Sequence, residues 1–256
     1  MKRTSRISSA SRRVALGAAV VLAATSASVA AADDGPGPFG VTALVGPTAE
    51  SARVGALFTA DEAGSLAGHH FCTASVVHSP QRDLIVSAAH CVDGDDTTGL
   101  VFVPGYRDGQ APYGVWKVGR RYLPDGWAKG QDEDSDVAFA VVDELGGKRV
   151  EEVTGANRFV SGVATGATAV TVTGYPDSRE VPISCTNKPV AHSATQQRID
   201  CPEFTGGTSG SPWVNGDHQV VGVLGGHEQG GSTADTSYSV VLGSEAGELY
   251  KDAAGG

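Results

Sequence analysis

Short apolar runs rich in β-branched residues recur along this chain, and turns containing glycine, proline or aspartate separate them. Runs of this kind predict strands rather than helices, because β-branched side chains fit a pleated, half-buried surface. Six strands are predicted in the first half, at residues 53–59, 71–77, 83–88, 100–103, 115–122 and 137–142. Six more are predicted in the second half, at residues 168–174, 183–190, 198–201, 212–214, 219–224 and 237–241.

Two sets of about six strands predict an all-β fold of two packed six-stranded antiparallel β-barrels. We place the first barrel at residues 53–146 and the second at 160–243. The segments 93–99 and 125–135 are rich in aspartate and glycine and are predicted as surface loops. Residues 243–253 predict a short C-terminal helix.

The first 32 residues have the pattern of a secretory signal peptide. Five basic residues precede an apolar run at 14–24, and small residues offer cleavage after Ala30 or Ala32. The run is too short to span a membrane, and no other stretch is long and apolar enough. We therefore expect a secreted, extracellular protein. Residues 33–52 contain proline and glycine without a strand pattern, which indicates a propeptide or an N-terminal arm.

Without that segment the chain is strongly acidic. Residues 33–256 carry 14 basic and 29 acidic side chains, which gives a formal charge of −15. This charge argues against nucleic acid or an anionic membrane as a partner and suits solubility outside a cell. We expect a monomer.

Four cysteines in an exported chain suggest two disulfides, for which three pairings exist. Proximity in the sequence favours Cys72–Cys91 and Cys185–Cys201. Each would close a loop of fewer than about 20 residues, worth roughly 3 kcal/mol if unstrained.

Two alternatives would place a metal ion instead. Zinc on Cys72, Cys91 and a nearby histidine would lack a CxxC pair and would need reduced thiols in an oxidising compartment. Calcium at the acidic turns 93–96 or 132–136 would lack a closing bidentate acid at loop spacing. We expect neither a metal nor a cofactor.

Three side chains are candidates for nucleophilic catalysis. Ser209 lies in a glycine-rich turn between two predicted strands, where backbone N–H groups can converge beside a nucleophile. Serine needs an imidazole to take its proton, and His90 follows an apolar strand and two alanines. Imidazole needs a partner that fixes its tautomer, and Asp136 leads directly into an apolar strand.

These residues and their order resemble the chymotrypsin-like (trypsin-like) serine protease family. Its histidine, aspartate and serine motifs stand here as Ser87-Ala88-Ala89-His90-Cys91, Asp136-Val137-Ala138-Phe139 and Gly207-Thr208-Ser209-Gly210-Ser211-Pro212. The resemblance implies a secreted serine endopeptidase that cleaves protein or peptide substrates through an acyl-enzyme. It also implies an oxyanion hole made by the N–H groups of Gly207 and Ser209.

One departure from the family changes the expected activation. Animal enzymes carry an aspartate before the nucleophile, which receives the new N-terminal ammonium after zymogen cleavage, whereas this chain has Thr208. That ion pair cannot form, so other contacts must hold the N–H groups. The Ser-Gly-Ser-Pro form resembles the bacterial branch that includes the glutamyl endopeptidases.

Specificity is expected to depend on the strand after the nucleophile, with Leu224, Gly225, Gly226 and His227 in one wall of the substrate pocket. Leu224 stands where the glutamyl endopeptidases carry a histidine, so selectivity for glutamate is not supported. Glu203 stands six residues before Ser209, where trypsin-type enzymes have an acid at the pocket base. Buried there, Glu203 would select Arg or Lys; the alternative is an exposed glutamate.

Two rival classes are weighed against the protease. An α/β-hydrolase would need Gly-x-Ser-x-Gly before a helix and its histidine last in the chain, and neither condition is met. A catalytically inactive, protease-like binding protein would keep the barrels and lose a triad residue. All three residues are present, although intact motifs do not prove catalysis.

Overall fold

A computed structural model of the chain describes residues 38–94 and 99–255. The chain divides into two units, residues 1–35 and 36–256, and only the second contains described residues. The predicted signal peptide at 1–32 and two aspartates of the first acidic turn, Asp95 and Asp96, therefore lie outside the described residues.

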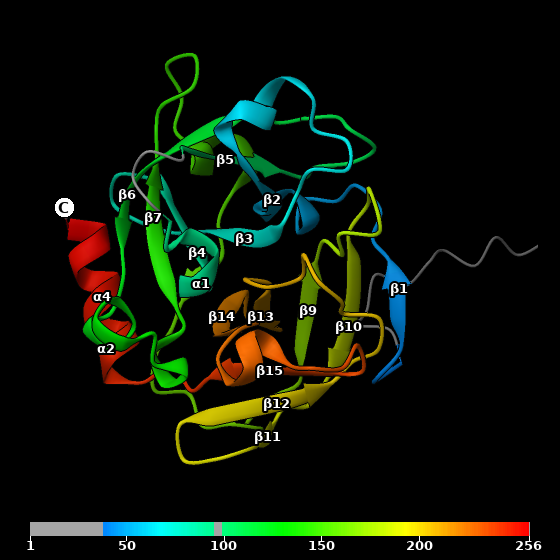
Figure 1. The fold of residues 1–256 in the computed structure, drawn as a ribbon, viewed down its shortest axis with the longest axis vertical. Coiled ribbons are helices and arrows are strands. Elements are labelled where there is room, and N and C mark those ends of the chain that lie inside the picture. The colour runs from blue at the N-terminus through cyan, green and yellow to red at the C-terminus, as the bar shows by residue number, and fades with distance from the viewer. Residues whose placement is uncertain (1–37, 95–98, 256) are drawn as a thin grey trace, which may run out of the picture. The chain divides into compact units, whose positions relative to one another are not determined.

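The first half of the described chain forms a closed barrel with strand order β2-β3-β4-β7-β6-β5 (Figure 1). All of its neighbouring strands pair antiparallel. The strands β3 and β4 are buried at every position, which is why their sequences are almost wholly apolar or small. The six strands are β2 (Val54–Thr59), β3 (Cys72–Val77), β4 (Leu84–Ser87), β5 (Leu100–Pro104), β6 (Trp116–Tyr122) and β7 (Ala138–Val142).

The second half, together with β1 from before the barrel, forms a six-stranded sheet of order β1-β10-β9-β13-β14-β8 and a three-stranded sheet of order β11-β12-β15. The two sheets meet where Gly225 N donates to Tyr238 O at 3.0 Å. Only the short β14–β8 pair is parallel among the described strands. The strands are β1 (Thr42–Leu44), β8 (Arg158–Phe159), β9 (Val170–Gly174), β10 (Ile183–Asn187), β11 (Val190–Ala191), β12 (Gln196–Asp200), β13 (Pro212–Asn215), β14 (Gln219–Val223) and β15 (Thr236–Val240).

Each of the twelve predicted runs contains a strand, and the run 183–190 divides into β10 and β11. The sequence shows no strand pattern in residues 33–52, yet β1 lies there and pairs with β10. It is missed because three residues are too few to show alternation, and the edge of β10 supplies its hydrogen bonds. The two-residue strand β8 is missed for the same reason.

The helices are short except at the C-terminus. The segment 125–135, predicted as a loop, instead contains α2 and a 3-10 helix, η3. The predicted C-terminal helix is α4, which lies against β6 and β7 (Figure 1) and buries Ala246, Ala253 and Ala254. None of the described helices is long and apolar enough to cross a membrane. The helices are α1 (Ala89–Val92), α2 (Asp125–Gly130), α3 (Val150–Thr154) and α4 (Ser244–Gly255), with 3-10 turns η1 (Ser51–Arg53), η2 (Ala60–Gly64), η3 (Glu133–Ser135) and η4 (His227–Gly230).

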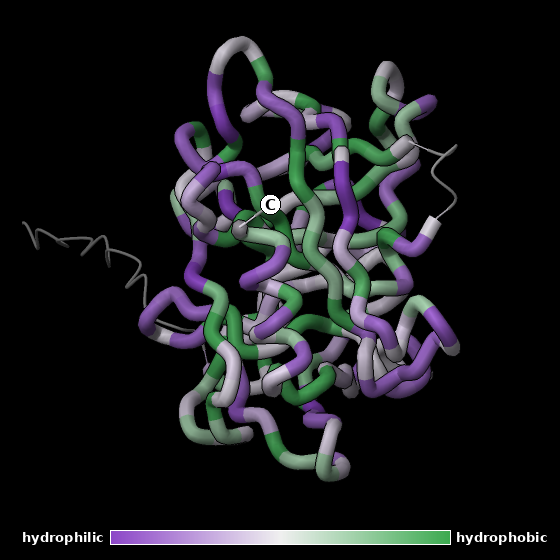
Figure 2. Tube along the Cα trace, turned by 90° about the vertical axis from the view of Figure 1, so that its left-hand side faces the viewer, coloured by the Kyte–Doolittle hydropathy of each residue, from purple (hydrophilic) through white to green (hydrophobic). Residues whose placement is uncertain are grey.

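Apolar side chains gather inside each half and between the halves. Figure 2 shows hydrophobic and hydrophilic stretches alternating along the chain, with many of the outer loops hydrophilic. Trp116 belongs to the core of the barrel, and Trp213 belongs to the core of the second half. A third cluster joins the halves, because Tyr175 packs with Val54 and Phe58 of β2. The two halves are therefore joined by buried apolar contacts.

Candidate active site

His90 lies on the single turn of α1, directly after β4. A disulfide between Cys72 of β3 and Cys91 ties this turn to the barrel, as proximity in the sequence favours. The side chain of His90 is 13% exposed, and the indole of Trp127 lies 6.3 Å from its ring, measured between ring centroids. The imidazole is thus fixed at the barrel surface with one edge open.

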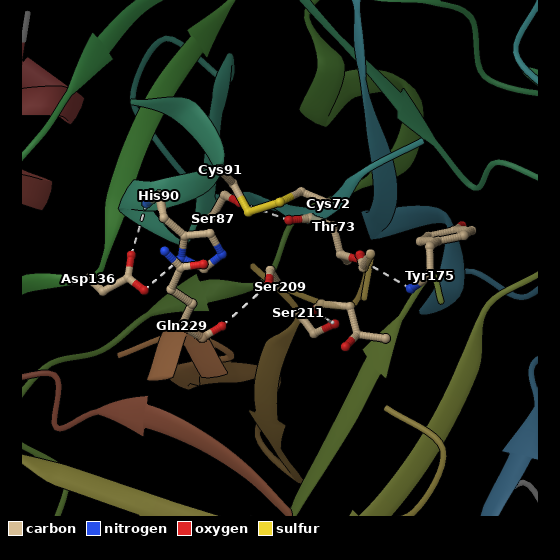
Figure 3. The surroundings of a disulfide bond; sticks show 12 residues. Cys72, Thr73, Ser87, His90, Cys91, Asp136, Tyr175, Ser209, Ser211 and Gln229 are labelled. Atoms are coloured by element: carbon tan, nitrogen blue, oxygen red, sulfur yellow. Dashed lines mark hydrogen bonds and ion pairs between the residues drawn. A yellow bond between two sulfur atoms is a disulfide. The ribbon is translucent and has the colours of Figure 1, made fainter. Parts of the chain in front are cut away.

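Asp136 is fully buried and accepts three hydrogen bonds (Figure 3). Its Oδ2 receives His90 Nδ1 at 2.7 Å and Gly226 N at 2.7 Å, and its Oδ1 receives His90 N at 3.0 Å. Because a carboxylate only accepts, Nδ1 of His90 donates to it, which leaves Nε2 on the other side of the ring. His90 is therefore held in the tautomer that a general base needs.

The contact between Asp136 and the second half depends on Gly225. A Cβ at Gly225 would lie 2.7 Å from Asp136 Oδ2, which is closer than real Cβ atoms approach. The buried segment Leu224-Gly225-Gly226 can therefore pass beside the carboxylate only without a side chain at this position. This glycine makes room for Asp136, and its place in the wall of the substrate pocket stays a prediction.

The turn that carries Ser209 has all four of its central carbonyls occupied. Gly206 O accepts Asp177 N at 2.7 Å, and Gly207 O accepts Thr73 Oγ1 at 3.0 Å. Thr208 O accepts both the N–H and the hydroxyl of Ser211, and Ser209 O accepts Thr73 N at 2.7 Å. By contrast, the N–H groups of Gly207 and Ser209 donate to no acceptor within the described residues. The turn thus has two N–H donors without an acceptor in the described part of the chain, while the carbonyls beside them are bound.

The hydroxyl of Ser209 has one hydrogen-bond partner within the described residues, on a neighbouring segment. Ser209 Oγ donates to Gln229 O at 3.5 Å (Figure 3), and within the described residues no hydrogen bond joins Ser209 to His90. Gln229 belongs to η4, in which Glu228 and Gln229 both have left-handed backbone angles, with φ of 50° and 55°. Catalytic hydrogen bonds are commonly long or poorly aligned before substrate binds, so this geometry is compatible with a resting nucleophile.

The predicted pocket residues are placed in two different environments. Leu224 is buried in the core of the second half and Gly226 is buried beside Asp136, whereas His227 is partly exposed and stacks on His192 at 4.9 Å between ring centroids. The side chain of Glu203 is 51% exposed and forms an ion pair with Arg179. Glu203 therefore shows the exposed alternative, and it lacks the burial expected of a carboxylate at the base of a pocket for Arg or Lys.

The zinc alternative and calcium at the second acidic turn do not fit the donors in the described part of the chain. Cys72, Cys91 and His90 place their donor atoms within 4.8 Å of one another, but the two sulfurs are bonded to each other and supply no thiolate. In the second acidic turn, Asp136 is engaged by His90, and Asp134 accepts Gln196 Nε2 at 2.9 Å. These carboxylates bind neighbouring protein donors.

Several residues at the site carry no sequence signal. Thr73 contacts the Ser209 turn from a position 134 residues away from Gly207, and Gln196 joins η3 to His227 N. Tyr175, whose N–H also reaches Thr73, is fully buried, and burial raises the pKa of its hydroxyl above the ordinary value. The second disulfide, Cys185–Cys201, lies in the core of the second half.

Comparison with known proteins agrees with this architecture. Protease Anisep from Arthrobacter nicotinovorans is 27% identical and superposes with a TM-score of 0.72, covering 84% of this chain and 100% of its own. A thermostable serine protease, AL20, from an extremophilic microorganism is 26% identical with a TM-score of 0.68, covering 81% and 99%. A Glu endopeptidase at 18% identity has a TM-score of 0.67, covering 86% and 99%, and shows the same fold. The fold is therefore that of the chymotrypsin-like serine proteases.

The family follows from the sequence itself. A family model for the trypsin-like peptidase domain matches residues 72–223, more than half of the chain. This protein therefore belongs to the trypsin-like peptidases. No curated protein sequence matches it.

Proposed function

We propose that this protein is a secreted serine endopeptidase that cleaves proteins or peptides through a Ser209-His90-Asp136 triad. The observation that carries the proposal is the 2.7 Å bond from His90 Nδ1 to the buried Asp136, beside a turn with two unused N–H donors. In this proposal, a signal peptide at 1–32 and a propeptide or arm at 33–52 precede a peptidase domain at 53–256 that acts as a monomer.

In the proposed chemistry the same catalytic groups act first in forming the acyl-enzyme and again in hydrolysing it. His90 Nε2 takes the proton of Ser209 Oγ as the oxygen bonds to the peptide carbonyl carbon. The N–H groups of Gly207 and Ser209 then stabilise the oxyanion. Next, His90 gives the proton to the leaving nitrogen as the C–N bond breaks. Water repeats the sequence on the acyl-enzyme, with its proton passing to His90 and then to Ser209.

This cycle requires one local movement. In the resting structure Ser209 Oγ faces Gln229 O, so it must turn to His90 Nε2 when substrate enters. The same observation favours the second candidate, a protease-like binding protein that never makes this movement. The two functions differ in whether Ser209 reacts.

A fluorophosphonate probe separates the two candidates. We expect it to label Ser209, mapped by mass spectrometry, and we expect the wild-type protein to hydrolyse casein. Ser209→Ala should lower turnover about 10⁴–10⁶-fold, and a further His90→Ala change should add little, because triad residues act as a unit.

Ser65→Ala, which alters an exposed serine on barrel one, is the matched control and should leave turnover unchanged. Absence of both labelling and hydrolysis in the wild-type protein would favour the binding protein. Undiminished hydrolysis in Ser209→Ala would overturn the assignment of the nucleophile.

A further inference from the structure

Thr73 connects the first barrel to the turn that carries Ser209. It follows Cys72 on β3, and its side chain is fully buried. Its hydroxyl donates to Gly207 O at 3.0 Å and accepts Tyr175 N at 3.0 Å, while its own N–H donates to Ser209 O at 2.7 Å. Thr73 therefore binds the turn on both sides of Thr208, and Figure 3 shows it between Ser209 and Tyr175.

The barrel also holds Thr73 itself. Ser87 Oγ donates to Thr73 O at 2.8 Å, and the neighbouring Cys72 is bonded to Cys91 beside His90. The residue that reaches the serine turn is thus anchored to the same two strands that carry the histidine. A shift of His90 relative to the turn that carries Ser209 would have to break these contacts of Thr73.

The peptide unit is planar, so a bond to a carbonyl also fixes the N–H on the other side of that unit. Asp177 N fixes the unit that contains Gly206 O and the N–H of Gly207. Ser211 fixes the unit that contains Thr208 O and the N–H of Ser209. The unit between them sets the angle between the two N–H donors. It is held at its N–H by Thr205 O, which accepts Thr208 N at 3.2 Å within the same turn, and at its carbonyl by the Thr73 hydroxyl, its only hydrogen bond with the first barrel within the described residues.

This middle unit is the one that most needs restraint. Gly207 has φ of +86°, and a Cβ there would lie 2.5 Å from Tyr175 O, so the position requires glycine. Glycine gives the backbone more rotational freedom than any other residue. Thr208 is uncharged and directs its hydroxyl to Thr205 O, so it supplies no ion pair to hold the turn.

We propose that the Thr73 hydroxyl is a positioning group that keeps the two N–H donors of the oxyanion hole aligned in the resting protein. This positioning role rests on the proposed peptidase function. Threonine or serine suits this place because one hydroxyl both donates to Gly207 O and accepts Tyr175 N. Valine would fill the same space and leave both backbone groups unpaired.

The test compares Thr73→Val, which removes the hydroxyl, with Thr73→Ser, which keeps it. Thr154→Val is the matched control, because it removes another buried threonine hydroxyl, one that donates to Val150 O on α3. For each protein we measure the rate of Ser209 labelling by a fluorophosphonate, kcat and KM on one peptide p-nitroanilide, and affinity for a peptide boronic acid. Thermal unfolding reports folding.

We expect Thr73→Val to lower kcat and the labelling rate about 100-fold, as misplaced catalytic groups do, with KM within about threefold of wild type. Boronic acid affinity should fall in parallel, because its tetrahedral adduct uses the same donors. Thr73→Ser should restore kcat to within about fivefold of wild type. Thr154→Val should lower the unfolding temperature without changing kcat.

Wild-type labelling and hydrolysis are read first, so failure of the proposed function is seen before any Thr73 variant is judged. With an active wild type, unchanged kcat in a folded Thr73→Val overturns the positioning role. A Thr73→Val that does not fold is replaced by Thr73→Ala, with the same expectation. If neither folds, the hydroxyl serves folding and the proposal is overturned.

Discussion

Two segments of the second half meet at Ser209 and are held in opposite ways: the turn that carries it and the segment that contains Gln229. The turn 206–211 is largely buried around the serine, and its carbonyls are bound by Thr73 from the first barrel and by Asp177 and Ser211 from the second half. The segment 226–231 exposes Glu228 and Gln229 in left-handed conformations. Its contacts with Asp136 and Gln196 are buried, whereas Glu228 N is bound by the exposed side chain of Glu133.

This difference corresponds to two requirements of acyl transfer. Donors that stabilise an oxyanion act best when they are already in place, so the turn is fixed from both halves. The segment, by contrast, holds the Ser209 hydroxyl through Gln229 O, a contact that the proposed cycle must break. The comparison therefore predicts large effects on turnover for changes in the turn and small effects for changes in the segment.

Among changes that leave the three triad side chains intact, the largest effect is expected for Gly207→Ala. Its Cβ would lie 2.5 Å from Tyr175 O and 2.6 Å from Asp177 N, and φ at this position is +86°. The turn must shift to accept it, which displaces a donor whose removal costs about 10²–10³-fold in kcat. We expect a loss of at least this size in the rate at which a fluorophosphonate labels Ser209.

Gly216→Ala is the control for this prediction, because a Cβ there would meet no atom within 4 Å. It should leave the labelling rate unchanged. A Gly207→Ala protein that reacts at the wild-type rate would show that the turn 206–211 is not the more firmly held of the two segments.

A smaller effect is expected for Ser211→Ala. Ser211 is fully buried, and its hydroxyl donates to Thr208 O. The same oxygen also accepts the N–H of Ser211, and this bond remains in the variant. Because one donor remains, we expect a loss of about 1 kcal/mol in the free energy of unfolding. The loss in kcat should be less than about tenfold, well below that of Gly207→Ala. Urea unfolding and steady-state kinetics measure the two quantities, and a loss as large as that of Gly207→Ala would contradict the ranking.

The sequence predicted the strands well and the contacts between distant segments poorly. Strands such as β3 and β7 follow from apolar, β-branched runs, a local property. The bond from Thr73 to Gly207 joins positions 134 residues apart, so no local pattern could indicate it. The position of Glu203 shows the same limit, because counting back from Ser209 cannot tell a buried acid from an exposed one paired with Arg179.

The smallest effect is expected for Glu133→Gln, in the contacts that hold the segment 226–231. Glu133 accepts Glu228 N at 3.1 Å, and its other oxygen lies 3.6 Å from His227 Nδ1, with half of the side chain exposed. Glutamine keeps an acceptor but removes the charge, and exposed ion pairs contribute only about 0.2–1 kcal/mol. If the segment borders the substrate site, KM should rise no more than about fivefold with kcat unchanged.

Glu62→Gln is the control, because it removes the charge of a similar exposed pair with His69 and should change neither constant. A kcat loss above tenfold in Glu133→Gln alone would mean that the segment is as rigidly coupled to catalysis as the turn, which would remove the distinction between them.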